Sequence, residues 1–243
     1  NTDLKKIIFS ILMLISFFSI FFIYNLILFR NRDKNFFYED YNLLVYVIVL
    51  VLVFLLFFGY NNDFINIVFS IFSSISNIGI SLNNEFNNLQ FIFLLLVIIG
   101  GSFFSTSSGL RFIKIYSLIK FSLNQILSFS KPRNIFMYRL LFSKKNFEIN
   151  EINKYFLSII IFIISLLVLT SLLAFSGIDF ERCLKISILT LMNTVNSSIY
   201  GIDDFDFQNI NFFTKYSLIL FMIVGRIELL TLLLIIKKYL FKN

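Results

Sequence analysis

Residues 69–114 read FSIFSSISNIGISLNNEFNNLQFIFLLLVIIGGSFFSTSSGLRFIK, and this stretch decides the interpretation of the whole chain. It contains a short apolar segment ending in SNIG, a polar crossing, and a long apolar segment interrupted by two glycines and the run STSSG. A segment too short to span a membrane, followed by a spanning segment that is broken, is typical of a pore loop beside a gated helix. The stretch therefore predicts part of an ion channel.

The composition is that of a membrane protein, because 58% of the 243 residues are hydrophobic and 14% are charged. The chain has one cysteine, Cys183, and no histidine. It therefore cannot build a disulfide framework, a Cys/His metal cluster or a nucleophile–histidine pair, and we expect a protein that is not an enzyme. The net charge of +7 does not predict nucleic-acid binding, since the basic residues lie between apolar runs, where they set membrane topology.

Long apolar runs predict five spanning helices, since a span needs about 20 mainly apolar residues. They cover residues 7–29, 41–60, 89–108, 155–178 and 216–236. Two shorter apolar pieces, residues 64–76 and 184–195, predict re-entrant segments. The order long, short, long occurs twice, starting at Tyr41 and again 114 residues later at Tyr155. We therefore predict an all-α membrane protein built from tandem helix–pore loop–helix repeats, with two re-entrant pore loops.

This pattern divides the chain into four parts. Residues 1–40 are the last helix of an earlier repeat, 41–130 a complete repeat with a broken second helix, 131–154 a basic cytoplasmic connector, and 155–243 a second complete repeat. Because the chain begins with Asn1 and not with Met, we expect it to be a fragment or a processed product. The connector is expected to bind a regulatory subunit or, as the simpler alternative, lipid.

The charges support this topology. If each repeat starts and ends in the cytoplasm, 15 of the 21 Lys and Arg residues are cytoplasmic, which agrees with the positive-inside rule. The outer face then carries five basic and eight acidic residues. Such an acidic face concentrates cations at a pore mouth, although acids on this side also follow from the topology alone.

The predicted selectivity filter lies where each short segment ends, because the partially negative C-terminal end of a half helix favours a cation. Backbone carbonyls there can replace the hydration shell of potassium, and glycine reaches the backbone angles that this requires. The alternative for each segment is an ordinary turn. In the second segment the expected glycine is replaced by Ser197 or Ser198, and Gly201 serves a turn. The predicted ion-binding residues are Ser76, Asn77, Ile78 and Gly79 in the first segment and Thr194, Val195, Asn196 and Ser197 in the second.

The predicted gate lies in the glycine- and serine-rich break, because such residues in mid-span destabilise a helix. The alternative is close helix packing through small residues. The gate residues are Gly100, Gly101, Ser105, Thr106, Gly109 and Arg111. Near the C-terminus, Arg226 is predicted to face the pore and limit cation flow, and Glu228 to face a neighbouring helix; a structural ion pair with another span is the alternative.

At these motifs the sequence resembles the TrkH/KtrB/HKT superfamily of potassium transporters, and TrkH most closely. The family pattern GG-x-x-GSTGGG-[IL]-K is similar to residues 100–111, GGSFFSTSSGLR, and the family motif GRLE is similar to GRIE at residues 225–228. The filter motif TTxGF resembles SNIGI at residues 76–80, and the HPN-type connector resembles KPRN at residues 131–134. Phe103-Phe104 and Ser107-Ser108 depart from the family's small residues and glycines.

The resemblance implies a pore of four repeats in one chain, of which this sequence supplies the last helix of the second repeat, the third and the fourth. It also implies potassium uptake in a bacterial inner membrane, a homodimer within the lipid bilayer, and cytosolic RCK (TrkA-like) regulatory subunits. The chain itself is expected to hold no cofactor beyond K⁺ at the filter carbonyls, any nucleotide being bound by the partner. The alternatives are a non-conducting structural or accessory subunit that needs a partner for the missing repeats, and a relative that co-transports Na⁺ or H⁺ with K⁺.

Overall fold

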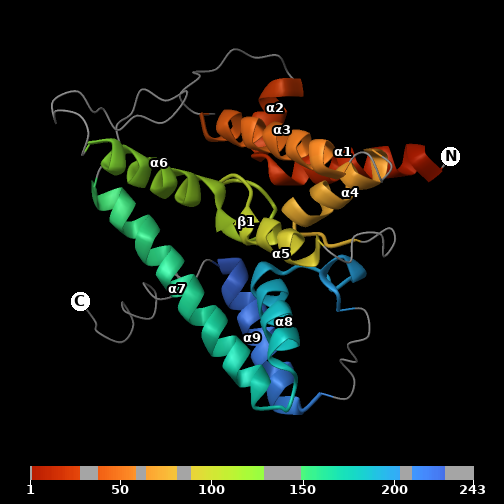
Figure 1. Ribbon diagram of the computed structural model, residues 1–243, viewed down its shortest axis with the longest axis vertical. Helices are drawn as coiled ribbons and strands as arrows, with labels where there is room; N and C mark the ends of the chain where they lie inside the picture. The colour runs from red at the N-terminus through yellow and green to blue at the C-terminus, as the bar shows by residue number, and fades with distance from the viewer. Residues whose placement is uncertain are drawn as a thin grey trace.

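The computed structural model describes residues 2–27, 38–58, 64–80, 89–128, 149–202 and 210–227. The described residues are helical except for one pair of two-residue strands and the connecting turns (Figure 1). The elements in chain order are α1 (Thr2–Phe17), α2 (Ile20–Ile27), α3 (Tyr38–Phe58), α4 (Phe64–Ile75), α5 (Gln90–Ile98), β1 (Ile99–Gly100), β2 (Leu110–Arg111), α6 (Phe112–Ser128), α7 (Ile149–Ala174), α8 (Phe180–Met192), the 3₁₀ turn η4 (Ser198–Tyr200) and α9 (Phe212–Ile227).

In the part of the chain that the structure describes, two helices are long and apolar enough to cross a membrane, α3 and α7, which have 21 and 26 residues. Among the described residues the number rises to three if the bent pair α1–α2 counts as one span. Both α3 and α7 expose large apolar side chains along much of their length, which suits contact with lipid. The predicted class, an all-α multi-pass membrane protein, is confirmed.

The two short apolar pieces form the short helices α4 and α8, of 12 and 13 residues. Neither is long enough to cross a bilayer at 1.5 Å per residue. Helix α8 begins at Phe180, earlier than the predicted 184, because its first turn carries Glu181 and Arg182, which end an apolar run but not a helix. Its charged end is exposed, while Cys183 and the residues that follow are largely buried.

The predicted span over residues 7–29 is not one straight helix, because it is divided into α1 and α2. Helices α1 and α2 meet at an angle of 118°, with the bend at residues 18–19. The hydroxyl of Ser19 accepts a hydrogen bond from the backbone N–H of Phe22 at 3.2 Å, so Ser19 caps a new helix. The carbonyls of Ser16 and Phe17, at the end of α1, bond to a distant loop instead of continuing the helix.

The predicted third span, residues 89–108, is helical only as far as Ile98, the end of α5. Helix α6 does not begin until Phe112, and the connecting residues 101–109 are called the β1–β2 loop below. Helix α7 begins at Ile149, inside the predicted connector, because its first turns are polar and escape a hydropathy criterion. The rest of the connector, Glu228 and the end of the fifth predicted span lie outside the described residues.

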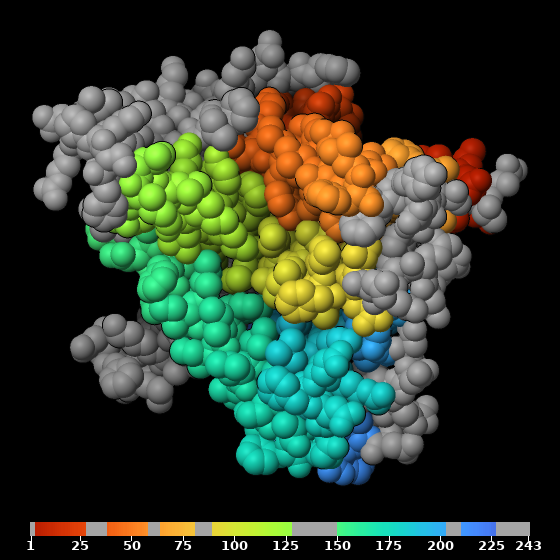
Figure 2. Space-filling view, viewed as in Figure 1, coloured from red at the N-terminus to blue at the C-terminus, as the bar shows by residue number. Residues whose placement is uncertain are grey.

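The helices form two groups joined by α5, which lies between α1–α4 and α7–α9 (Figure 1). In the space-filling view α5 separates the same two groups on this face of the molecule (Figure 2). Helix α1 packs on α4, and α5 packs on α8. Each of the two short helices therefore contacts a helix from the preceding part of the chain.

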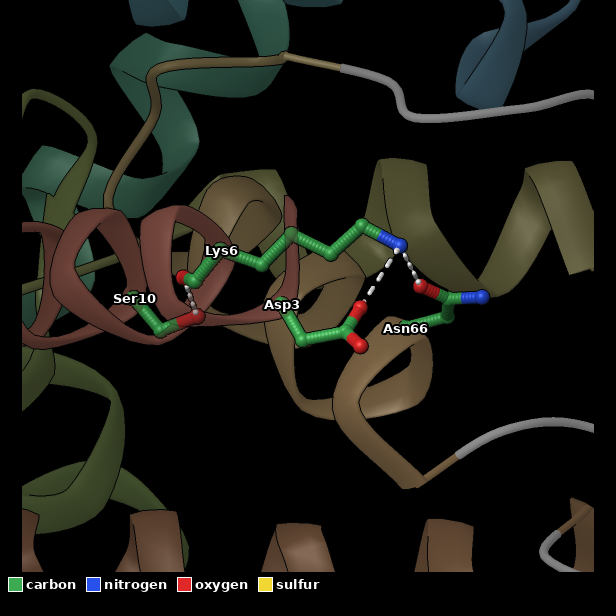
Figure 3. Close-up of polar contacts among 4 residues, drawn as sticks. All are labelled: Asp3, Lys6, Ser10 and Asn66. Carbon is green, nitrogen blue, oxygen red and sulfur yellow. Dashed lines mark hydrogen bonds and ion pairs between the residues drawn. The ribbon is translucent and has the colours of Figure 1, made fainter. Parts of the chain in front are cut away.

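The contact between α1 and α4 includes a polar link at one end of α1 (Figure 3). The ammonium of Lys6 donates to the amide oxygen of Asn66 at 2.8 Å and lies 3.8 Å from the carboxylate of Asp3. Asn66 is buried in the first turn of α4, so this bond fixes where the short helix begins relative to α1. Farther along, α4 buries Ile71 and Ile75 completely, which anchors the end where the filter was predicted.

Candidate ion pathway

The two short helices end in the same turn. Asn77 after α4 and Asn193 after α8 have φ angles of 60° and 53°, the left-handed region that asparagine tolerates best among residues with a side chain. The next N–H then bonds back over five residues, from Ile78 to the Ser73 carbonyl at 3.1 Å and from Thr194 to the Leu189 carbonyl at 2.9 Å. These hydrogen bonds are those of a Schellman turn. Because both helices end in the same turn, residues 73–79 correspond position by position to residues 189–195.

The two predicted filter segments lie side by side. The backbone N–H of Val195 points to the carbonyl oxygen of Ile78 at 3.4 Å, a long hydrogen bond between the two segments. A Cβ added to Gly79 would overlap the carbonyl oxygen of Val195 and lie 2.8 Å from the Thr194 side chain. The structure thus brings together residues that are 116 positions apart, at the ends of two short helices.

Gly79 and Val195 occupy equivalent positions but differ in conformation. Gly79 has a φ of 76°, whereas Asn77 and Asn193 are the only described residues with a side chain and a positive φ. The glycine position of the second segment is therefore Val195, and not Ser197 or Ser198 as the sequence predicted. Ser198 begins η4, and Gly201 ends it with a φ of 70°, which agrees with the turn role predicted for Gly201.

The residues of the second segment differ in their exposure to solvent. Thr194 is buried, Val195 is exposed, and Asn196 and Ser197 are half-buried. Thr194 and Asn196 also line a cavity of about 400 Å³ that extends between α8 and α9 to Lys215 and Met222. At the first segment, the Ser73 hydroxyl donates to the Ile80 carbonyl at 2.8 Å and holds the chain just after Gly79.

The β1–β2 loop is a closed structure held by its own small residues. Ile99 pairs with Leu110 and Gly100 with Arg111 in a parallel register. The end of α5 and the start of α6 therefore lie close together, with the loop projecting between them. Within the loop, the Gly101 N–H donates to the Ser107 hydroxyl at 2.9 Å. The hydroxyls of Ser105 and Ser107 are 3.0 Å apart. A helix over this stretch could not make these bonds.

The loop lies directly against the first filter segment and against α9. The side-chain amide of Asn77 donates to the carbonyl of Ser108 at 2.8 Å, and the guanidinium of Arg226 donates to the Ser108 hydroxyl at 2.9 Å. Ser108 therefore links Asn77, a predicted filter residue, to the predicted pore arginine. A Cβ on Gly109, whose φ is 102°, would lie 3.1 Å from the sulfur of Met192, so the loop also contacts the end of α8.

A small polar cavity of about 60 Å³ lies under the loop. Among the described residues, its lining contains two arginines and no acid: Ser105, Thr106, Ser107, Ser108, Gly109, Arg111, Gly225 and Arg226. Arg111 also donates to the Ser102 carbonyl at 2.9 Å and lies over the Phe103 ring. The cavity is large enough for one or two waters of about 30 Å³ each, and its two positive charges oppose entry of a cation.

Four of the six predicted gate residues, Ser105, Thr106, Gly109 and Arg111, line this cavity with Arg226, and Gly100 lies against Gly109. Gly101 donates to Ser107 within the loop and also packs on the carbonyl of Phe17 at the α1–α2 bend, where Thr106 donates to the Ser16 carbonyl at 3.1 Å. Sequence reasoning missed this bend, and it also missed Glu39 and Asp40 in the first turn of α3, which face the same loop. The only sequence signal was a pair of acids opening an apolar run.

We expect Gly101→Ala to destabilise the protein by about 2 kcal/mol or more, because a methyl group there would overlap the backbone oxygen of Phe17 and no rotamer relieves the overlap. Thermal unfolding in detergent measures the effect. Gly177→Ala is the control, since nothing lies within 4 Å of a Cβ at Gly177 and only the strain of its φ of 79° remains. Equal melting temperatures for the two variants would contradict the packing described for the loop.

No family model matches the chain, and no curated protein matches it in sequence. Among solved structures, the chain is similar to the potassium transporter TrkH from Vibrio parahaemolyticus, with a TM-score of 0.65 and 20% sequence identity. The match covers 84% of this chain and 44% of TrkH, so the chain spans less than half the length of that protein. The chain therefore has a TrkH-like fold.

Proposed function

We propose that this chain forms part of a potassium-conducting pore in a membrane, with the ion passing between the filter segments at residues 76–79 and 194–197. One observation carries the proposal: the ends of two short helices meet, through Val195 and Ile78, beside a loop that lies across the path. Potassium selectivity is built from backbone carbonyls at such helix ends. The TrkH-like fold supports the same function.

A complete filter needs further segments, because two segments can surround an ion on one side only. The chain corresponds to less than half of TrkH, so in this proposal further polypeptide supplies the remaining pore walls. Helix α9, which packs on α8 and exposes Phe213, Tyr216 and Ile223, is one surface available to such polypeptide. A homodimer, RCK subunits and a bacterial inner membrane remain predictions from the resemblance.

The β1–β2 loop in its described position corresponds to a closed gate. Its cavity is small and positively charged, and its carbonyl at Ser108 is bound by the filter residue Asn77. Conduction requires that the loop move away from Arg226 and Asn77. Opening therefore costs at least the two hydrogen bonds at Ser108, each of about 1 kcal/mol net, and more for the charged guanidinium.

Uptake in cells tests the proposal. Cells that lack their own potassium uptake, expressing the longest reading frame that contains this chain, are expected to grow at low potassium and to accumulate Rb⁺. Excess K⁺ should suppress Rb⁺ uptake, and excess Na⁺ should not. Equal suppression by both would mean a pathway that does not select K⁺ over Na⁺, whereas Rb⁺ uptake that requires Na⁺ would favour co-transport. Protein that reaches the membrane without any uptake above that of the empty vector would argue against a conducting role.

A second function, a non-conducting structural subunit, is favoured by one observation. Val195 stands where the second filter segment would need the conformation of Gly79, and its side chain is exposed on the segment. A valine there prevents the segment from copying the backbone of the first one. If this function is correct, the chain reaches the membrane and supports the uptake of a partner but conducts nothing alone.

A further inference from the structure

We propose that Asp40 is a positioning residue for the β1–β2 loop: its carboxylate, at the start of α3, holds the N-terminal end of α2 at the bend that is bonded to the loop, while the adjacent Glu39 lies near the start of α6. The inference rests on the proposed function for its meaning in transport, but its geometry and its first test do not. Neither residue lines the cavity under the loop.

Asp40 holds the first break. Its carboxylate accepts the backbone N–H of Ser19 at 3.0 Å, and Ser19 caps α2 at the 118° bend. The side chain is 3% exposed, so water does not replace this bond when the carboxylate is absent. A carboxylate at the first turn of a helix also interacts favourably with the positive end of the helix dipole.

Glu39, the neighbour of Asp40, lies near the second break, with the backbone of Phe103 and Ile113 and the charge of Arg111 close to its carboxyl. Its Oε1 atom is buried and has no hydrogen-bond partner among the described residues. The hydrogen bond of Asp40 therefore carries the proposal.

The two breaks are also bonded to each other. The N–H of Ser102 donates to the Phe17 carbonyl at 3.2 Å, and the N–H of Ile20 donates to the Phe104 carbonyl at 3.4 Å. The rings of Phe21 and Phe104 pack edge to face at 5.2 Å between centroids. Because the bend and the loop share these bonds, removing the Asp40 carboxylate loosens the loop as well as the bend. Asp40 therefore sets how readily the loop leaves its place beside the predicted filter.

Thiol accessibility tests this without any transport. Ser107 is buried in the loop, and Cys183 is the only cysteine of the chain. The background protein carries Cys183→Ser and Ser107→Cys, has any cysteine outside this chain changed to serine, and is purified in detergent from the longest reading frame. In this background we expect Asp40→Ala to raise the rate of thiol modification at position 107 about tenfold, as loss of one buried hydrogen bond implies. Asp40→Asn keeps an acceptor oxygen and is expected to return the rate to within about threefold of the parent.

The control is Ser165→Ala, which removes a buried hydroxyl bonded within α7, far from the loop in sequence. It should leave the rate unchanged. Equal rates in Asp40→Ala and the parent, or equal increases in Asp40→Ala and Ser165→Ala, would overturn the proposal. In cells, Asp40→Ala should raise Rb⁺ uptake severalfold. Absence of uptake in every variant would contradict the pore, while the thiol rates would still decide the role of Asp40.

Discussion

Gly79→Ser is expected to reduce Rb⁺ uptake at least about tenfold while leaving the protein in the membrane. The new side chain would be strained at a φ of 76°, and its Cβ would overlap the carbonyl oxygen of Val195. A left-handed conformation costs about 1–3 kcal/mol at a residue with a side chain, and the neighbour that must move is backbone of the other filter segment. We therefore expect the substitution to change the shape of the predicted filter as well as the stability of the protein.

Gly177→Ser is the matched control for this experiment. Gly177 has nearly the same φ, 79°, but nothing lies within 4 Å of a Cβ there. It shares the backbone strain of Gly79→Ser and lacks the contact between the two segments. We expect Rb⁺ uptake by Gly177→Ser to stay within about twofold of wild type once it is scaled to the amount of protein in the membrane. A similar loss in both variants would mean that strain alone, and not the filter contact, explains the result.

Arg226→Gln is expected to have the opposite effect and to raise Rb⁺ uptake about tenfold. The substitution removes one of the two positive charges at the cavity under the β1–β2 loop and weakens the bond that holds Ser108. A cation about 4 Å from a guanidinium is repelled by about 4 kcal/mol where the effective dielectric constant is near 20. Even a partial loss of this repulsion between arginine and the passing ion would therefore raise the flux strongly.

Arg226→Lys separates the two causes, since it keeps the charge and loses the planar guanidinium that reaches Ser108. If the charge limits flow, the lysine variant conducts like wild type. If the bond to the loop limits flow, the lysine variant conducts like the glutamine variant. Reduced uptake in both variants would instead support the alternative that Arg226 is a structural residue.

Local sequence signals were sufficient for the elements whose hydrophobic pattern is self-contained. Helices α3 and α7 were predictable because each contains an apolar run long enough to cross a bilayer. Helix α4 was predictable because its apolar run is long enough for only about half of one. The break after Ile98 was also predictable, because two adjacent glycines and five small polar residues weaken a helix wherever they occur.

Features that depend on distant partners were not predictable. The run around Ser19 contains neither proline nor glycine, and the chain bends there because Asp40 and the β1–β2 loop take its backbone groups. The position of Val195 could not be found by searching for a missing glycine, since the equivalence with Gly79 depends on hydrogen bonds back to Ser73 and Leu189. A single sequence carries no record of either pairing.

The most direct test of the central claim is Rb⁺ flux into liposomes that contain only the purified product of the longest reading frame with this chain. Driven by a potassium gradient, wild-type protein is expected to take up Rb⁺, with Gly79→Ser at background and Gly177→Ser near wild type. That result would assign conduction to the protein itself. Well-folded, membrane-inserted protein with no flux above that of empty liposomes, or equal flux in wild type and Gly79→Ser, would contradict a pore between residues 76–79 and 194–197.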